Sequence, residues 1–172
     1  MSDEIFYFFR ISEAIKSFPH QTLDMDILVV GDCHGEKPDL GEEGKEADLI
    51  IVTGDVCGDS EEIRNAMFRA VEEEKDWWDI IGREEAKKAV NKSLQEGRDV
   101  FEYLDSFEKP VFVVPGNWDW IGDETWAFLA ENRFQNMIDD FKNIHNIDRE
   151  VFTDGNFSYI GYGPCSAPEI PQ

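Results

Sequence analysis

Three runs of consecutive apolar residues stand out along the chain. They are MDILVV (25–30), ADLIIV (47–52) and KPVFVV (109–114). A strand that is covered on both faces of a parallel sheet is hydrophobic throughout, whereas a strand with one wet face alternates. The pattern therefore predicts an α/β fold, in which a mostly parallel sheet is flanked by the helices that connect its strands.

The segment between the second and third runs has apolar residues at helical spacing. Asp59 and Glu62 form a capping-box pattern that predicts the start of a first helix, and Gly82 precedes the start of a second. The apolar stripe of the first helical part is Ile63, Met67, Ala70, Val71, Trp78 and Ile81. We therefore expect a helical hairpin inserted at about residues 60–108.

The remaining elements are predicted near the two ends of the chain. Ser2 can cap a helix that Pro19 ends, which predicts an N-terminal helical extension over residues 1–20. Periodic apolar residues predict another helix over 126–141. The pair Asp154-Gly155 is typical of a two-residue hairpin turn between two strands.

Composition narrows the functions open to this fold. The 172 residues suffice for a single domain, residues 1–172, and the formal net charge of −22 repels nucleic acids and anionic membranes. A phosphate-bearing substrate would need local positive charge, which bound metal ions can supply. The three cysteines lack paired spacing and the apolar run at 5–9 lacks a basic leader, so we expect a cytoplasmic protein.

Each apolar run ends in a glycine followed by an oxygen donor: Gly31-Asp32, Gly54-Asp55 and Gly116-Asn117. Ligands of open parallel sheets bind beyond the carboxyl ends of the strands, so these three endings would converge. If the chain after the first run is extended, residues two apart project to the same side, so Asp32 and His34 can bind one ion while Cys33 faces away. Carboxylate, imidazole and amide donors suit divalent Mn, Fe or Zn.

These motifs resemble the pattern of the calcineurin-like metallophosphoesterases, D-x-H, G-D-x-x-D and G-N-H-[D/E], followed by later histidine motifs. The matches are DCH at 32–34, GD at 54–55 and GNWD at 116–119, in the same order, within a resemblance that covers roughly residues 25–163. The resemblance implies the metallophosphoesterase sandwich, in which helices flank a mostly parallel sheet. It also implies two divalent metal ions, with Mn favoured over Fe, Zn or Ni.

The resemblance assigns roles to the matching residues. Asp32 and His34 would bind the first ion, Asp55 would bridge the two ions, and Asn117 would bind the second. Asp55, Asn117 and Asp119 are the candidate catalytic residues, although an acid at a helix start is an alternative reading of Asp119. The implied activity is hydrolysis of a phosphate ester by a water that two metal ions activate.

The sequence departs from the family pattern at three places. Gly58 stands in place of the second acid of G-D-x-x-D, and Trp118 stands in place of the histidine that protonates the leaving group. The resembling subgroup without this histidine includes phosphodiesterases, which cleave substrates with better leaving groups or use other acids, so the resemblance implies a phosphodiester as the more suitable substrate. The later histidine motifs are missing too, so we expect the natural chain to continue past Gln172, and we interpret His145 as structural.

Several residues leave more than one interpretation open. Trp118 and Trp120 could line the substrate pocket or pack in the core, and the Trp77-Trp78 pair could belong to a lid, a dimer surface or the core. A zinc site with thiolates from Cys33 and Cys57 is disfavoured, since their spacing matches no such pattern.

The leading function is hydrolysis of a small-molecule or nucleotide-type phosphoester, without membrane association and with a homo-oligomer left open. The competing interpretation is a non-catalytic interaction scaffold on the same fold, which the missing histidines favour. A nuclease is disfavoured by the net charge and by the lack of a basic strip.

Overall fold

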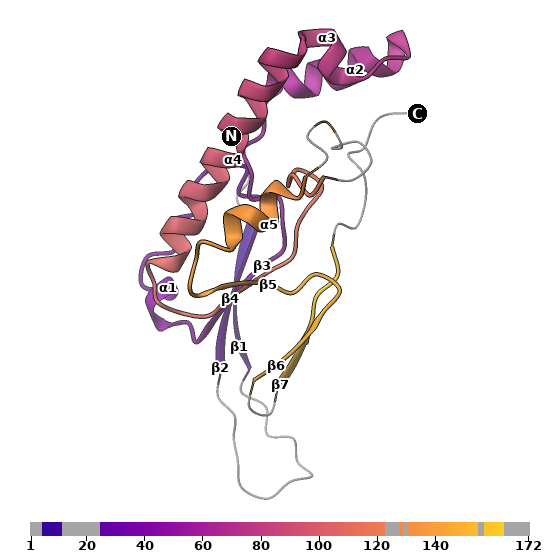
Figure 1. The fold of residues 1–172 in the computed structure, drawn as a ribbon. Coiled ribbons are helices and arrows are strands. Elements are labelled where there is room, and N and C mark those ends of the chain that lie inside the picture. The colour runs from indigo at the N-terminus through magenta and orange to yellow at the C-terminus, as the bar shows by residue number, and fades with distance from the viewer. Residues whose placement is uncertain (1–4, 12–24, 123–127, 129–130, 155–156, 164–172) are drawn as a thin grey trace, which may run out of the picture.

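A five-stranded sheet forms the centre of the computed structural model, which describes residues 5–11, 25–122, 128, 131–154 and 157–163 (Figure 1). The strands lie in the order β1 (Ile5–Ile11), β2 (Met25–Gly31), β3 (Leu49–Val52), β4 (Val111–Val113) and β5 (Ile144–Asn146). Neighbours from β2 to β5 are parallel. The three apolar runs thus form adjacent parallel strands, and the predicted α/β class is confirmed.

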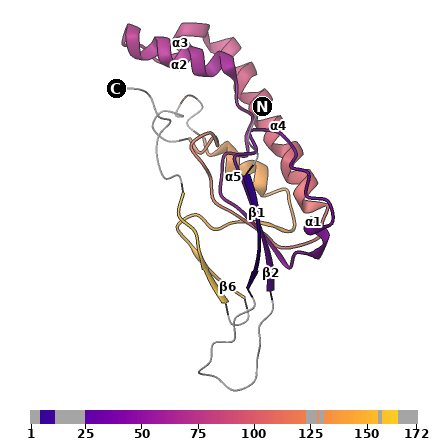
Figure 2. The same ribbon diagram turned by 180° about the vertical axis from the view of Figure 1, so that it is seen from behind.

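The N-terminal segment is a strand where the sequence pattern predicts a helix. All seven residues of β1 pair antiparallel with β2, and Figure 2 shows β1 beside β2 at the edge of the sheet. The open backbone edge of β2 offers hydrogen bonds to a segment rich in aromatic residues, which overrides the helical periodicity. The predicted extension over 1–20 is therefore wrong at 5–11, and its other residues lie outside the described part.

The helices of the described residues are α1 (Glu43–Glu46), α2 (Glu61–Glu73), α3 (Trp77–Ile81), α4 (Arg83–Asp105) and α5 (Arg133–Ile138). Figure 1 shows α2 and α3 beyond one end of the sheet, whereas α4 and α5 lie over one of its faces. Between them and the sheet lies the larger core, in which Ile50, Phe101 and Leu104 are fully buried. Among the described residues, no helix combines the length and the apolar character needed to span a bilayer.

The insertion between β3 and β4 is helical, but it contains three helices instead of two. Ser60 caps α2 by accepting a hydrogen bond from the backbone N–H of Ile63 at 3.3 Å. The predicted cap, Asp59, instead forms an ion pair with Arg64 at 3.1 Å. Val71 was expected on the buried stripe, but its side chain is 51% exposed.

The helix predicted over 126–141 is much shorter in the structure. Among the described residues of this range, the α-helix is α5, which has six residues and begins directly after Asn132. Asn132 caps α5 by accepting from the backbone N–H of Gln135 at 2.8 Å. Residues 123–127 and 129–130 lie outside the described part.

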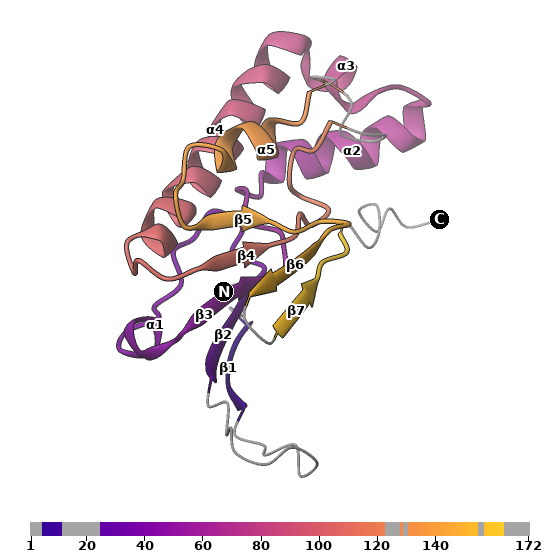
Figure 3. The same ribbon diagram turned by 60° about the horizontal axis from the view of Figure 1, so that its bottom comes forward.

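A separate hairpin of β6 (Val151–Asp154) and β7 (Phe157–Ile160) crosses the other face of the sheet, as Figure 3 shows. The ring centroid of Phe112 lies 4.6 Å from that of Phe152 and 4.8 Å from that of Tyr159. The predicted turn at 154–155 begins one residue too early, because Asp154 is still part of β6 and pairs with Phe157. Residues 155–156 lie outside the described residues. The side chains of Val151, Ile160 and Tyr162 are 65%, 77% and 70% exposed.

Truncation of a core valine tests the two-layer packing of the sheet. Val111→Ala in β4 should lower the free energy of unfolding by about 2 kcal/mol, because its fully buried side chain would leave a cavity. The matched change Val151→Ala in β6 should cost about 0.5 kcal/mol or less, because that side chain is exposed. Urea denaturation with an unchanged slope measures both; equal losses would contradict the packing described here.

Candidate metal centre

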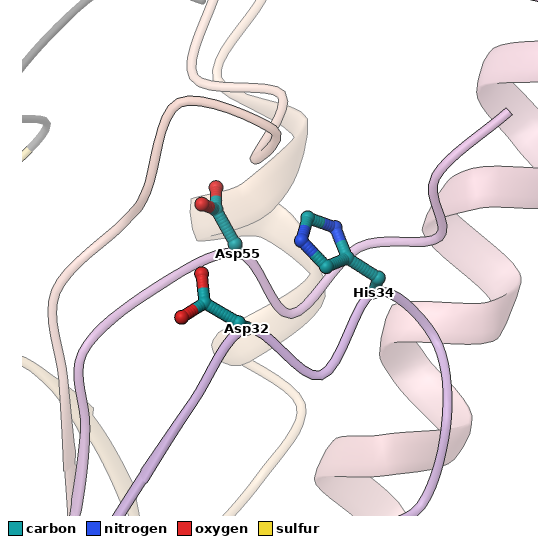
Figure 4. A group of neighbouring side chains, drawn as sticks. All are labelled: Asp32, His34 and Asp55. Atoms are coloured by element: carbon teal, nitrogen blue, oxygen red, sulfur yellow. The ribbon is translucent and has the colours of Figure 1, made fainter. Parts of the chain in front are cut away.

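Asp32, His34 and Asp55 meet at the carboxyl ends of β2 and β3 (Figure 4). One ligand atom of each lies within 4.8 Å of the others. Asp32 is exposed, whereas His34 and Asp55 are half-buried. The convergence expected from two of the three strand endings is therefore present.

These three residues share an unusual backbone conformation. Their φ angles are +53° for Asp32, +46° for His34 and +54° for Asp55. Side-chain-bearing residues rarely adopt positive φ, and each instance costs about 1 to 3 kcal/mol when the structure imposes it. The ligand atoms of Asp32 and His34 do lie close together, but the extended chain assumed for this is wrong. Cys33 between them is buried in the larger core.

Backbone hydrogen bonds hold the two loops together. The N–H groups of Asp32, His34 and Gly35 donate to the carbonyls of Gly54, Asp55 and Val56 at 3.2, 2.8 and 2.9 Å. The loop after β2 thus continues to pair with the loop after β3 beyond the ends of the strands. This pairing fixes the distance between the β2 ligands and Asp55.

Asp119 ties the third loop to the second. Its carboxylate accepts from the backbone N–H groups of Asp55 at 3.0 Å, Val56 at 3.1 Å, Cys57 at 2.9 Å and Gly116 at 2.8 Å. The side chain is fully buried. Neither the catalytic role expected of Asp119 nor the helix-start role fits this environment, because both oxygens are occupied by backbone donors. Asp119 is a positioning residue, and its spacing in the sequence gave no signal of this.

The loop after β4 also contacts Asp55 directly. The backbone N–H of Trp118 donates to Oδ1 of Asp55 at 2.7 Å, which limits the orientations open to that carboxylate. Asn117, the neighbour of Trp118, is half-buried. Its expected contact with a second metal ion stays a prediction, as does its catalytic role.

The tryptophans pack chiefly in the core. Trp120 is 1% exposed, and its indole N–H donates to Oγ of Ser93 at 2.8 Å. Trp77 is 3% exposed and contacts Trp78 and Trp120 with its ring. Trp118 is 9% exposed and lies edge-on to His34, with ring centroids 6.4 Å apart. Among the tryptophans that the structure describes, Trp118 is thus the one whose ring borders the site.

The remaining histidine and cysteines of the described region do not join this group of ligand atoms. His145 lies in β5 instead of at a helix exit, and its ring stacks on Phe152 with centroids 5.8 Å apart, in keeping with a structural role. Cys33 and Cys57 are free and buried. Burial raises the pKa of the Cys57 thiol well above its usual range, which opposes a zinc thiolate there.

Burial dominates the electrostatics of Asp55. Loss of solvation raises the pKa of its carboxyl from 3.8 to about 6, against the opposing effect of the Trp118 N–H. The negative charges of Asp119 and Asp32 raise this pKa further, whereas His34 lowers it. Burial also raises the pKa of Asp119. A bound cation would offset the cost of keeping these carboxylates charged.

Comparison with known proteins places this geometry in a family. The family profile described as calcineurin-like phosphoesterase (Metallophos) matches residues 25–165, a span that contains the whole site. The chain belongs to the calcineurin-like phosphoesterase family. The family resemblance seen in the strand-end motifs is therefore confirmed.

A solved crystal structure supports the same fold. It is 17% identical in sequence and superposes with a TM-score of 0.56, covering 79% of this chain and 51% of its own. The chain thus spans about half the length of that neighbour, and at this identity the likeness concerns the fold. No curated protein matches the sequence significantly.

Asp119→Asn tests the positioning role of the buried carboxylate. The amide can accept only at its oxygen, so at least one buried backbone N–H loses its partner, and the free energy of unfolding should fall by about 3 kcal/mol. Asp99→Asn on the surface of α4 serves as the matched control and should change it by less than about 0.5 kcal/mol. Urea denaturation measures both; equal stability of the two variants would refute the role.

Asp55→Asn tests the raised pKa of Asp55. Because the folded pKa, about 6, exceeds the ordinary 3.8, the folded protein binds the proton more tightly than the unfolded chain, and this stabilising contribution is lost as pH rises through about 4 to 6. An asparagine at position 55 does not titrate, so the variant does not lose stability in this way. With EDTA present, the free energy of unfolding of the variant minus that of the wild type should therefore increase by about 1 kcal/mol between about pH 5 and about pH 7.5. A constant difference in urea denaturation would contradict the shift.

Proposed function

We propose that the protein hydrolyses a phosphate diester with the help of divalent cations bound at Asp32, His34 and Asp55. The observation that carries the proposal is the meeting of their ligand atoms within 4.8 Å at the carboxyl ends of adjacent parallel strands. Membership of the calcineurin-like phosphoesterase family supports phosphoester hydrolysis as the reaction class.

The side chains fit a divalent metal ion. Two carboxylates and one imidazole are a donor set for Mn, Fe or Zn. Burial raises the pKa of Asp55, with a smaller contribution from the neighbouring carboxylates, and a bound cation would favour its charged form. When bound, such ions supply positive charge to the phosphate and lower the pKa of a water molecule. Asn117 is our candidate for a second ion, which would complete a two-metal site.

The chain's own residues would hold this site in place before substrate arrives. Asp32 is the exposed member of the group, while the Trp118 N–H donates to the carboxylate of Asp55 and limits its orientation. These constraints reduce the reorganisation that binding requires.

The substrate class follows from charge and from the residue at position 118. An indole cannot protonate a leaving group, so the site suits a diester whose leaving group departs as a stable anion. The net charge of −22 disfavours long polyanions, which leaves small-molecule or nucleotide-type diesters.

Hydrolysis of bis(4-nitrophenyl) phosphate with added Mn²⁺ tests the proposal. Asp55→Asn and His34→Asn should each lower kcat/KM by at least about 100-fold, because each removes a ligand. His145→Asn, the same exchange outside the site, should stay within about twofold of wild type. Wild-type protein that binds Mn²⁺ without turnover would instead support the non-catalytic scaffold, and loss of activity in all three variants would argue against this site.

A further inference from the structure

Helix α4 places one acidic side chain across the two metal-site loops. An ideal Cβ built on Gly58 would collide with Oε2 of Glu96, and one built on Gly35 would lie 2.7 Å from Cβ of Glu96. Gly35 directly follows His34, and Gly58 follows Asp55 by three residues. The missing side chains at both glycines therefore make the space that the Glu96 carboxylate occupies.

The backbone on either side of Glu96 is fixed to the same loop. The backbone N–H of Gly58 donates to the carbonyl of Ser93 at 3.0 Å, and Oγ of Ser93 donates to the carbonyl of Gly58 at 2.7 Å. On the next turn of α4, a Cβ at Gly97 would lie 3.0 Å from Cα of Cys57. Glu96 thus projects from a helix segment that cannot retreat from the site.

One ring nitrogen of His34 has no hydrogen-bond partner in the part of the chain that the structure describes. Nδ1 is buried and makes no hydrogen bond with any described residue. In Figure 4 one ring nitrogen points toward Asp55, while the other, on the side of the ring joined to the backbone, points away from both carboxylates. A histidine that binds a metal through one nitrogen usually donates the N–H of the other to a carboxylate or carbonyl, which fixes the ring.

We propose that Glu96 is the positioning carboxylate of the metal site, accepting the Nδ1–H of His34 when Nε2 of His34 holds a divalent cation. Its carboxylate already lies over Gly58 and beside the residue that follows His34. The ion pair that holds its other oxygen, to Lys92 at 3.5 Å, is exposed and so weakly restrains it. The inference rests on the cation-binding part of the proposed function, not on hydrolysis.

Calorimetric titration of the full chain with Mn²⁺ alone tests the assignment. Glu96→Gln keeps the shape of the side chain but weakens the acceptor for Nδ1–H, so the dissociation constant for Mn²⁺ should rise about tenfold or more. Glu102→Gln on the same helix is the matched control: it removes the same charge from an exposed position paired with Arg98, and should leave the constant within about twofold. Thermal melting without metal should be the same for both variants, which separates positioning from folding.

The outcomes distinguish this inference from the proposed hydrolysis. Equal Mn²⁺ affinity of the Glu96 and Glu102 variants would overturn the role of Glu96 and leave the hydrolysis proposal intact. A selective loss of affinity in Glu96→Gln would support the role even if the wild type turned over no phosphodiester. A wild type that binds no Mn²⁺ would overturn both.

Discussion

The buried carboxylate of Asp119 is the constraint on which the site depends. Four backbone N–H groups from two loops converge on it, so the third strand ending is locked to the second, and the second in turn pairs with the first. Within such a network each bond is strengthened by exclusion of water, and losing the acceptor leaves several donors unsatisfied at once. This network compensates for the left-handed backbone at Asp32, His34 and Asp55.

The part of the fold that local chemistry determines could be predicted from the sequence. Strands buried on both faces need continuous apolar residues, so β2, β3 and β4 were visible in the hydrophobic pattern. The N-terminal strand was not, because its pairing depends on the free edge of β2, which no local periodicity reports. The exposure of Val71 and the brevity of α5 likewise depend on which neighbours each helix finds.

The candidate site likewise has a part that could be predicted from the sequence and a part that could not. The positions of Asp32, His34 and Asp55 after buried strands predicted their meeting, because parallel strands end at a common edge. The role of Asp119 could not be predicted, because almost every residue has a backbone N–H. The sequence does not show which of these groups need a side-chain acceptor in the folded protein. The departure at Gly58 has a steric explanation that only coordinates supply: the Glu96 carboxylate already fills the volume that a side chain there would need.

The β6–β7 hairpin bears on how the protein behaves in concentrated solution. In the described part of the chain it is a two-stranded sheet that exposes Val151 and Ile160, with the exposed Tyr162 two residues after β7, and such surfaces adhere to one another. The net charge of −22 opposes that adhesion by mutual repulsion between molecules. Added electrolyte shortens the range of the repulsion while leaving the apolar attraction in place. Solubility should therefore fall as ionic strength rises, and dilute buffers should favour monodisperse samples.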